Sequence, residues 1–328
     1  MLRTTILALA VVAPALCWGQ GADSVEVTGL PRSEPLPVPT ELGAEQAPRA
    51  KDFGAPDWAT LSRRDELELR SAAALVIDQE DGQLLYAKNT DAVMPIASIT
   101  KLMTAVVVLD AGLPLEEPIT IDRADMDYLK GTRSKLKVGT TLTRRQLLRL
   151  ALMASENRAA AALARTYPGG TPAFVQAMNQ KARQLGMRDT HFRDATGLDP
   201  SNVSTAMDLA LLVNAGYGYT LIRDFSTTES YRLAFEGSRR KRMRMLAFRN
   251  SNGLVRNSEW EIGLQKTGYI SEAGRCLVMQ ARIATRPVII VLLDSWGKFT
   301  RIADANRIKR WIESFEAAPL STRPLRIS

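Results

Sequence analysis

The 328-residue chain has one histidine, His191, and two cysteines, Cys17 and Cys276. A Ser-His-Asp hydrolase would have to use that histidine, but no nucleophile signature such as G-x-S-x-G lies near it, so a histidine triad is not expected. The sequence also lacks carboxylates clustered at ligand spacing, which excludes a typical metal site. We therefore expect no metal and no cofactor, and a catalytic serine in this chain would need a lysine as its base.

The N-terminus has the pattern of a secretory signal peptide. Met-Leu-Arg precedes an apolar run, Ile6 to Cys17, that is too short to span a bilayer. Removal of residues 1–22 leaves Cys276 alone, so the mature chain can form no internal disulfide. Lys and Arg number 43 against 35 Asp and Glu, a formal net charge of +8. Export and basic charge suggest anionic surroundings such as a cell envelope, although most charges are expected to be scattered and solvated. No nucleic-acid partner is expected.

Three further regions follow the signal peptide. Residues 23–64 are predicted to be a flexible proline-rich linker, because they hold few bulky apolar residues. Its prolines are Pro31, Pro35, Pro37, Pro39, Pro48 and Pro56. A folded domain is expected over residues 65–316, followed by a short tail, residues 317–328.

The pattern of the folded domain predicts an α+β architecture. Five strands are expected, at residues 71–78, 83–87, 262–270, 276–283 and 288–294, the first two joined by the hairpin signal Asp81-Gly82. Helical patterns fill the middle of the chain, and a helix over residues 300–315 closes it. Short strands are also expected near residues 135–138 and, after a basic run, at residues 246–248. The strands at both chain ends predict one antiparallel sheet flanked by helices, with an inserted helical region.

A serine and a lysine three residues apart open the first long apolar helix. On a helix Ser98 and Lys101 lie on one face, and the helix N-terminus favours negative charge developing at the serine. Lys101 could take the serine's proton if burial or a neighbouring cation lowers its pKa. Ser-x-x-Lys recurs at Ser134, Ser238 and Ser295, but none of these opens a long apolar helix.

Two more motifs occur once each. Ser155-Glu156-Asn157 falls at a junction between two predicted helices, where side chains can point into a cleft. Lys266-Thr267-Gly268 falls on a predicted strand, where the glycine permits close approach of a substrate backbone. The lysine and threonine could hold a carboxylate.

In this order the three motifs resemble the signature of the penicillin-binding proteins and serine β-lactamases. Roughly residues 65–315 resemble the low-molecular-mass penicillin-binding proteins, and several details look most like the D-alanyl-D-alanine endopeptidase branch. The segments that carry the likeness are 98–110, 151–170, 186–198, 204–206 and 266–279. The resemblance implies a β-lactamase/DD-peptidase-like fold with a five-stranded sheet.

The resemblance also implies roles for individual residues. Ser98 would attack the D-Ala carbonyl and form an acyl-enzyme, with Lys101 as general base. Ser155 would relay a proton, and Asn157 would contact Lys101 and the substrate amide. Lys266 and Thr267 would bind the terminal carboxylate of the substrate, beside Gly268. The backbone N–H groups of Ser98 and Tyr269 would form the oxyanion hole. Arg301 aligns loosely with a family arginine that helps to bind the carboxylate.

The implied protein is a periplasmic enzyme that cuts the peptide cross-link between D-Ala and diaminopimelate. Its partners would be peptidoglycan stem peptides, with β-lactams as covalent inhibitors. The tail is too short for the membrane anchor of carboxypeptidase relatives, so no stable anchor is expected. The motifs do not separate the endopeptidase from a D,D-carboxypeptidase. A β-lactamase is disfavoured, because the class A enzymes use a glutamate after the Ser-x-Asn motif and none lies between Arg158 and Thr228. A β-lactam or peptidoglycan-binding module is disfavoured, because every catalytic position is intact.

Overall fold

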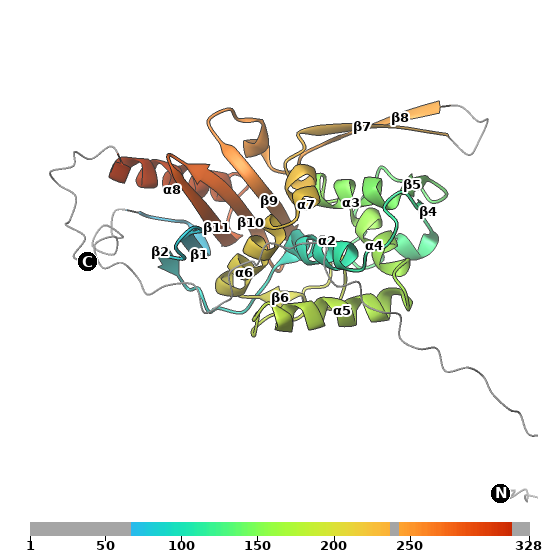
Figure 1. Ribbon diagram of the computed structural model, residues 1–328, viewed down its shortest axis with the longest axis horizontal. Helices are drawn as coiled ribbons and strands as arrows, with labels where there is room; N and C mark the ends of the chain where they lie inside the picture. Colours follow the sequence, from blue (N-terminus) through green and yellow to red (C-terminus); the bar gives the residue numbers. More distant parts are fainter. Residues whose placement is uncertain (1–66, 237–242, 317–328) are drawn as a thin grey trace, which may run out of the picture. The chain divides into compact units, whose positions relative to one another are not determined.

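A computed structural model describes residues 67–236 and 243–316. The expected signal peptide, proline-rich linker and C-terminal tail, and most of the basic run before β8, lie outside the described residues. The described residues all belong to one compact unit (Figure 1).

The central element is a five-stranded antiparallel sheet in the order β2-β1-β11-β10-β9. Its strands are β1 (Ser71–Asp78), β2 (Leu84–Lys88), β9 (Glu261–Ile270), β10 (Gly274–Ile283) and β11 (Arg286–Ser295). The first and last strands pair directly, with Ser71 opposite Ser295 and Asp78 opposite Val288. The predicted sheet built from both chain ends is therefore confirmed.

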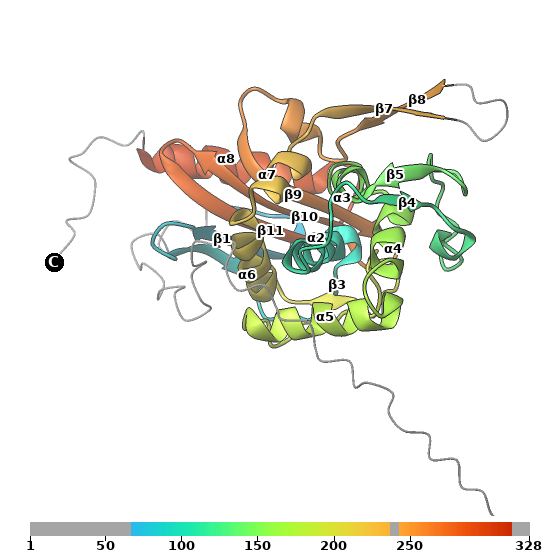
Figure 2. The same cartoon turned by 45° about the vertical axis from the view of Figure 1, so that its right-hand side comes forward.

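Helices cover both faces of the sheet, which explains the nearly continuous apolar runs in the strands. In β11, Val288, Ile290 and Leu292 pack into a core with helix α8 (Thr300–Glu316). The alternate residues Ile289, Val291 and Leu293 join the larger core of the helical region. Figures 1 and 2 show α8 on one side of the sheet and α2 and α6 on the other.

The inserted helical region surrounds one buried helix, α2 (Thr100–Asp110), whose residues from Thr100 to Val108 are all buried. A helix buried on all sides needs apolar residues around its whole circumference, as this one has. The other helices are α3 (Arg144–Met153), α4 (Asn157–Arg165), α5 (Gly170–Gln184), α6 (Ala206–Tyr217) and α7 (Thr220–Ser226). Within the described ranges no helix has the length and apolar character to cross a bilayer.

Small strands complete the fold: β3 (Met94–Pro95) pairs with β6 (Val203–Ser204), and β4 (Pro118–Thr120) with β5 (Thr141–Thr143). The expected strand at residues 246–248 is part of β8 (Met243–Arg249), which pairs with β7 (Ser230–Glu236) in a ribbon that extends from the helices in Figure 2. The sequence did not predict β7 or α7.

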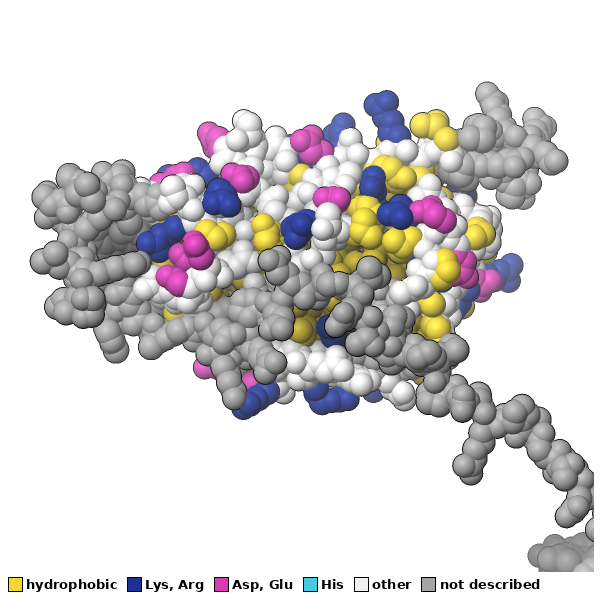
Figure 3. All heavy atoms as spheres, viewed as in Figure 1, with side chains coloured by type: hydrophobic (Ala, Val, Ile, Leu, Met, Phe, Trp, Pro, Cys, Tyr) yellow, Lys and Arg dark blue, Asp and Glu magenta, His cyan; other side chains and the backbone are white. Residues whose placement is uncertain are grey.

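The predicted strand at residues 135–138 is wrong. The backbone there is irregular, and its hydrogen-bonding groups are paired with side chains in place of a neighbouring strand. Ser134 Oγ accepts from the Leu136 N–H at 3.0 Å, and Arg158 donates to the Leu136 carbonyl at 2.7 Å. In Figure 3, Lys and Arg side chains alternate with Asp and Glu over the visible described surface, as expected for scattered charge.

Candidate active site

Ser98 lies in a short 3₁₀ turn, η3 (Ala97–Ile99), that leads directly into α2. Its side chain is partly exposed, whereas its neighbours Ala97 and Ile99 are buried. Ala97 has a φ of +47°, an unfavourable conformation for alanine, and its carbonyl accepts from Thr100 Oγ1 at 2.8 Å. Such backbone strain is found chiefly where the surrounding structure fixes a functional group in place.

Lys101 is fully buried beneath Ser98. Its Nζ lies 2.9 Å from Ser98 Oγ, 2.7 Å from Asn157 Oδ1 and 2.5 Å from the Thr196 carbonyl oxygen. The two carbonyl oxygens can only accept hydrogen bonds, whereas the serine hydroxyl can also donate. A neutral amine therefore fits well: it donates to both carbonyl oxygens and keeps its lone pair for the hydroxyl hydrogen of Ser98.

Burial also makes the neutral form of Lys101 accessible at neutral pH. Burial lowers the pKa of Lys101 to about 7, against the raising influence of the Asp194, Glu156 and Asp127 carboxylates. A base with a pKa near 7 is about half unprotonated at neutral pH, which is the range in which general bases work best.

The turn between α3 and α4 brings Asn157 to Lys101 and Ser155 to Lys266. Ser155 has a φ of +56°, a second strained non-glycine residue, and its Oγ lies 2.9 Å from Lys266 Nζ. Asn157 donates from Nδ2 to Thr132 Oγ1 at 2.9 Å, and Thr132 donates to Asp127 Oδ2 at 2.6 Å. These bonds fix the amide of Asn157 so that its oxygen faces Lys101.

Lys266, in β9, forms a second buried serine–lysine pair with Ser155. Its Nζ also donates to the Thr267 carbonyl oxygen at 2.7 Å. Burial, together with the charges of Lys101 and Arg301, holds the pKa of Lys266 well below its usual value. Lys266 can therefore exchange a proton with Ser155 near the reacting atoms.

Strand β9 runs close beside the Ser98 turn at Gly268. A Cβ on Gly268 would lie 2.9 Å from the Ile96 carbonyl oxygen and 3.2 Å from the Ser98 nitrogen, so a larger residue would not fit without movement. Arg301, in the first turn of α8, donates to the Gly268 carbonyl at 3.1 Å. This approach brings the backbones of Ser98 and Tyr269 to one place, as an oxyanion hole requires.

A loop that the sequence left without a role completes the surroundings of Lys101. Asp194 Oδ1 accepts from the N–H groups of Thr196 at 2.5 Å and Gly197 at 2.6 Å. Gly197 has a φ of +77°, and a Cβ there would lie 1.9 Å from the Ala97 carbonyl oxygen. The Asp-x-Thr-Gly pattern signals a turn, but nothing in it reveals that Thr196 contacts Lys101. Two other partners were also missed: Thr132, and Ser251, whose Oγ lies 2.7 Å from Thr267 Oγ1.

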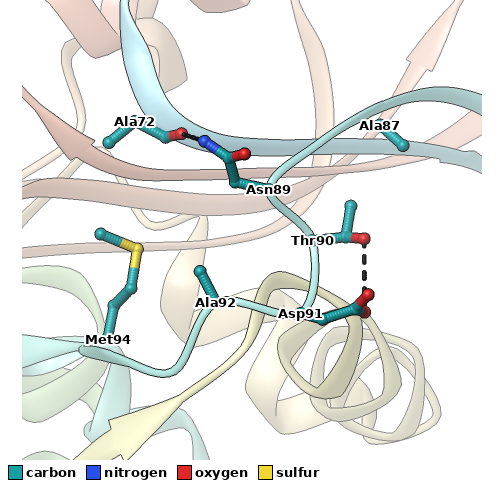
Figure 4. A pocket seen from close by; sticks show the side chains of 7 residues that line it. All are labelled: Ala72, Ala87, Asn89, Thr90, Asp91, Ala92 and Met94. Carbon is teal, nitrogen blue, oxygen red and sulfur yellow. Dashed lines mark hydrogen bonds between the residues drawn. The ribbon is translucent and has the colours of Figure 1, made fainter.

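A separate hollow of about 520 Å³ lies beside β1 and β2 and holds none of these residues (Figure 4). Its lining residues are Ala72, Ala87, Asn89, Thr90, Asp91, Ala92 and Met94. The Asn89 side chain donates to the Ala72 carbonyl at 2.7 Å, and no buried charged side chain lines the hollow. The serine–lysine chemistry therefore belongs to the residues around Ser98 and Lys101 and not to this hollow.

Fold and site together are those of a serine peptidase in which a buried lysine, in place of a histidine, lies beside the serine hydroxyl. Residues 60–297 match the family model described as D-alanyl-D-alanine carboxypeptidase. The chain belongs to this family of serine D-Ala-D-Ala peptidases, which act on bacterial peptidoglycan.

Two bacterial relatives are named D-alanyl-D-alanine endopeptidase. The Pseudomonas aeruginosa protein is 49% identical over 262 residues, covering 79% of this chain and 83% of the relative. The Escherichia coli protein is 44% identical over 267 residues, covering 81% of this chain and 85% of the relative. Among solved structures, the Streptomyces K15 DD-transpeptidase aligns with a TM-score of 0.70 and 30% identity over 75% of this chain and 98% of that one. The predicted family and fold are therefore confirmed.

Proposed function

We propose that this protein is a periplasmic serine D,D-endopeptidase that hydrolyses D-Ala–diaminopimelate cross-links in peptidoglycan. The observation that carries the proposal is the buried Lys101 amine, 2.9 Å from Ser98 Oγ and oriented by Asn157 and the Thr196 carbonyl. The endopeptidase specificity rests on relatives of that name that are 49% and 44% identical to this chain. The periplasmic location rests on the signal-peptide pattern of residues 1–22.

In the proposed first half-reaction, Ser98 Oγ attacks the D-Ala carbonyl carbon while Lys101 takes the hydroxyl proton. The N–H groups of Ser98 and Tyr269 stabilise the oxyanion that forms. The C–N bond of the tetrahedral intermediate then breaks, and the departing diaminopimelate amine receives the proton held by Lys101, relayed through Ser155, the partner of Lys266, so that Lys101 is neutral again. The acyl-enzyme and a free amine remain.

In the second half-reaction a water molecule attacks the ester carbonyl and Lys101 accepts its proton. The ester bond to Ser98 breaks, the serine regains its proton, and a free D-Ala carboxylate leaves. Thr267 and Arg301 are proposed to hold the carboxylate that lies next to the scissile bond. The same acylation step opens the β-lactam ring of penicillin, so β-lactams are proposed as covalent inhibitors.

A D,D-carboxypeptidase that removes only the terminal D-Ala is the second candidate. It is favoured by the family description and by relatives such as the Streptomyces K15 protein, 33% identical and named D-alanyl-D-alanine carboxypeptidase. Its reaction uses the same groups, with free D-Ala as the leaving group.

Purified cross-linked muropeptide dimers, incubated with mature enzyme and analysed by chromatography and mass spectrometry, separate the candidates. The proposed endopeptidase splits the dimers into tetrapeptide monomers, and Ser98→Ala serves as the inactive control. Loss of only a terminal D-Ala would make the protein a carboxypeptidase, and unchanged dimers would indicate a β-lactam or peptidoglycan-binding module.

A further inference from the structure

Three large apolar side chains are exposed beside the oxyanion hole. Tyr269, Trp296 and Phe299 expose 57%, 89% and 68% of their surfaces. Soluble proteins seldom leave large aromatic side chains together at the surface unless the patch binds something. The mechanism above uses only the backbone of Tyr269 and neither of the other two residues.

Sheet register places these residues at one end of the sheet. Tyr269 of β9 is opposite Arg275 of β10, and Arg275 is opposite Ser295, the last residue of β11. Trp296 follows immediately, in the turn that leads through Phe299 into α8. We call Tyr269, Arg275, Trp296 and Phe299 the aromatic rim.

The aromatic rim is next to the bond-breaking site. Tyr269 directly follows Gly268, whose backbone lies against the Ser98 turn. Arg301, two residues after Phe299, donates to the Gly268 carbonyl at 3.1 Å. A chain extending past Thr267 and Arg301 would therefore meet the rim next.

The rim carries positive charge without a matching acid. The Arg275 guanidinium lies 4.5 Å from the centre of the Tyr269 ring, a cation–π contact that holds it in place. Across the described residues no carboxylate forms an ion pair with Arg275. The two acids nearest to Arg275 in sequence and in sheet register, Glu272 and Asp294, do not form ion pairs with it. Glu272 pairs with Lys130, and the Asp294 carboxylate lies where a Gly274 side chain would be. An anionic ligand fits this surface.

We propose that the aromatic rim binds the leaving strand of a peptidoglycan cross-link, with Arg275 holding a second carboxylate of that strand. The inference rests on the proposed endopeptidase function. A D-Ala leaving group ends at the carboxylate held by Thr267 and Arg301. The leaving group of a cross-link continues as a stem peptide with further carboxylates and aliphatic side chains, which match the cation and the aromatic rings of the rim.

The test compares two reactions of the same mature enzyme: cleavage of a cross-linked dimer, and acylation by benzylpenicillin, which has no leaving strand. In Arg275→Gln the ratio of dimer kcat/KM to the acylation rate constant should fall at least tenfold, because one charge-assisted contact is lost. Trp296→Ala should change the ratio in the same direction. Arg282→Gln is the matched control, since Arg282 is on the same strand, at its far end, with Glu261 as its partner.

A second substrate identifies the group that Arg275 holds. Dimers whose leaving strand carries carboxamides at the carboxylates remote from the scissile bond should be cleaved more slowly by the wild type. Arg275→Gln should cleave both dimers at similar rates, because the mutated and amidated partners belong to one interaction.

Several results would overturn the inference. Equal losses on the dimer and on penicillin would mean that Arg275 only supports the active site. An unchanged ratio in Arg275→Gln, or equal cleavage of amidated and unmodified dimers by the wild type, would exclude the proposed occupant. Failure of the wild type to cleave any dimer while it is still acylated would instead refute the endopeptidase function itself.

Discussion

Asn157 Nδ2 donates to Thr132 Oγ1 at 2.9 Å, which connects the residues around Lys101 to the loop over residues 126–133. Thr132 in turn donates to Asp127 Oδ2 at 2.6 Å. The same loop reaches across to the β9–β10 turn through an ion pair between Lys130 and Glu272. The orientation of Asn157, and with it one contact of Lys101, therefore depends on residues outside the three motifs.

Thr132→Val should lower the acylation rate by about tenfold, because it removes the acceptor that fixes the Asn157 amide and leaves a hydrogen bond unmade, at about 1–3 kcal/mol. Stopped-flow acylation by a chromogenic β-lactam measures the effect. Thr141→Val is the control: the Thr141 hydroxyl pairs with that of Thr120 on a surface strand at 2.8 Å and does not bond to Asn157. Equal rates in Thr132→Val and wild type would show that the amide needs no such support.

The acylation rate should rise with pH through a midpoint near 7. Burial lowers the pKa of Lys101 to about 7, and only the unprotonated amine can accept the Ser98 proton. Below that pH the reactive fraction falls about tenfold per pH unit, and above it the rate levels off. A rate that is flat from pH 5 to 9 would exclude Lys101 as the base in the rate-limiting step.

Lys101→Arg should slow acylation by about 10²–10⁴-fold, because a guanidinium stays protonated and cannot act as general base. Circular dichroism and thermal unfolding check that the variant is folded. An acylation rate within threefold of wild type would move the base elsewhere, with Lys266 as the next residue to test.

Ser98→Ala should abolish covalent labelling by penicillin, because Ser98 is the one serine among the described residues that is hydrogen-bonded to Lys101. Intact-protein mass spectrometry detects one penicilloyl adduct on the wild type and none on the variant. Full labelling of Ser98→Ala would contradict the assignment of the nucleophile.

Gly197→Ala should destabilise the fold by about 1–3 kcal/mol more than Gly112→Ala. Both glycines have positive φ, +77° and +61°, so both variants carry the same kind of backbone strain. At Gly197 a Cβ would also lie 1.9 Å from the Ala97 carbonyl, whereas at Gly112 it meets nothing within 4 Å.

Urea unfolding of the two glycine variants gives the difference in free energy, and penicillin labelling reports on the Ser98 turn. Similar unfolding free energies, with labelling intact in both variants, would mean that the loop at Gly197 moves away from the Ser98 turn at little cost.

The sequence by itself determined the α+β class, the sheet from both chain ends and the three motifs. These depend on local patterns: apolar runs, turn signals and fixed spacings such as Ser98 to Lys101, which one helical turn brings together. Arg301 aligned only loosely, yet its guanidinium is 3.1 Å from the Gly268 carbonyl, 33 residues away in sequence. The missed strand β7 and the wrong strand at residues 135–138 show the limit of local patterns. At residues 135–138, side chains instead of a neighbouring strand form hydrogen bonds with the backbone.

Only the tertiary structure decided what surrounds the lysine base. The Thr196 carbonyl reaches Lys101 from 95 residues away and Asn157 from 56, and burial of that amine lowers its pKa. Burial and contacts between distant segments arise when the whole chain packs, so no short stretch of sequence encodes them. The aromatic rim also depends on the tertiary structure, because sheet register and the start of α8 bring Tyr269, Arg275 and Trp296 to one end of the sheet.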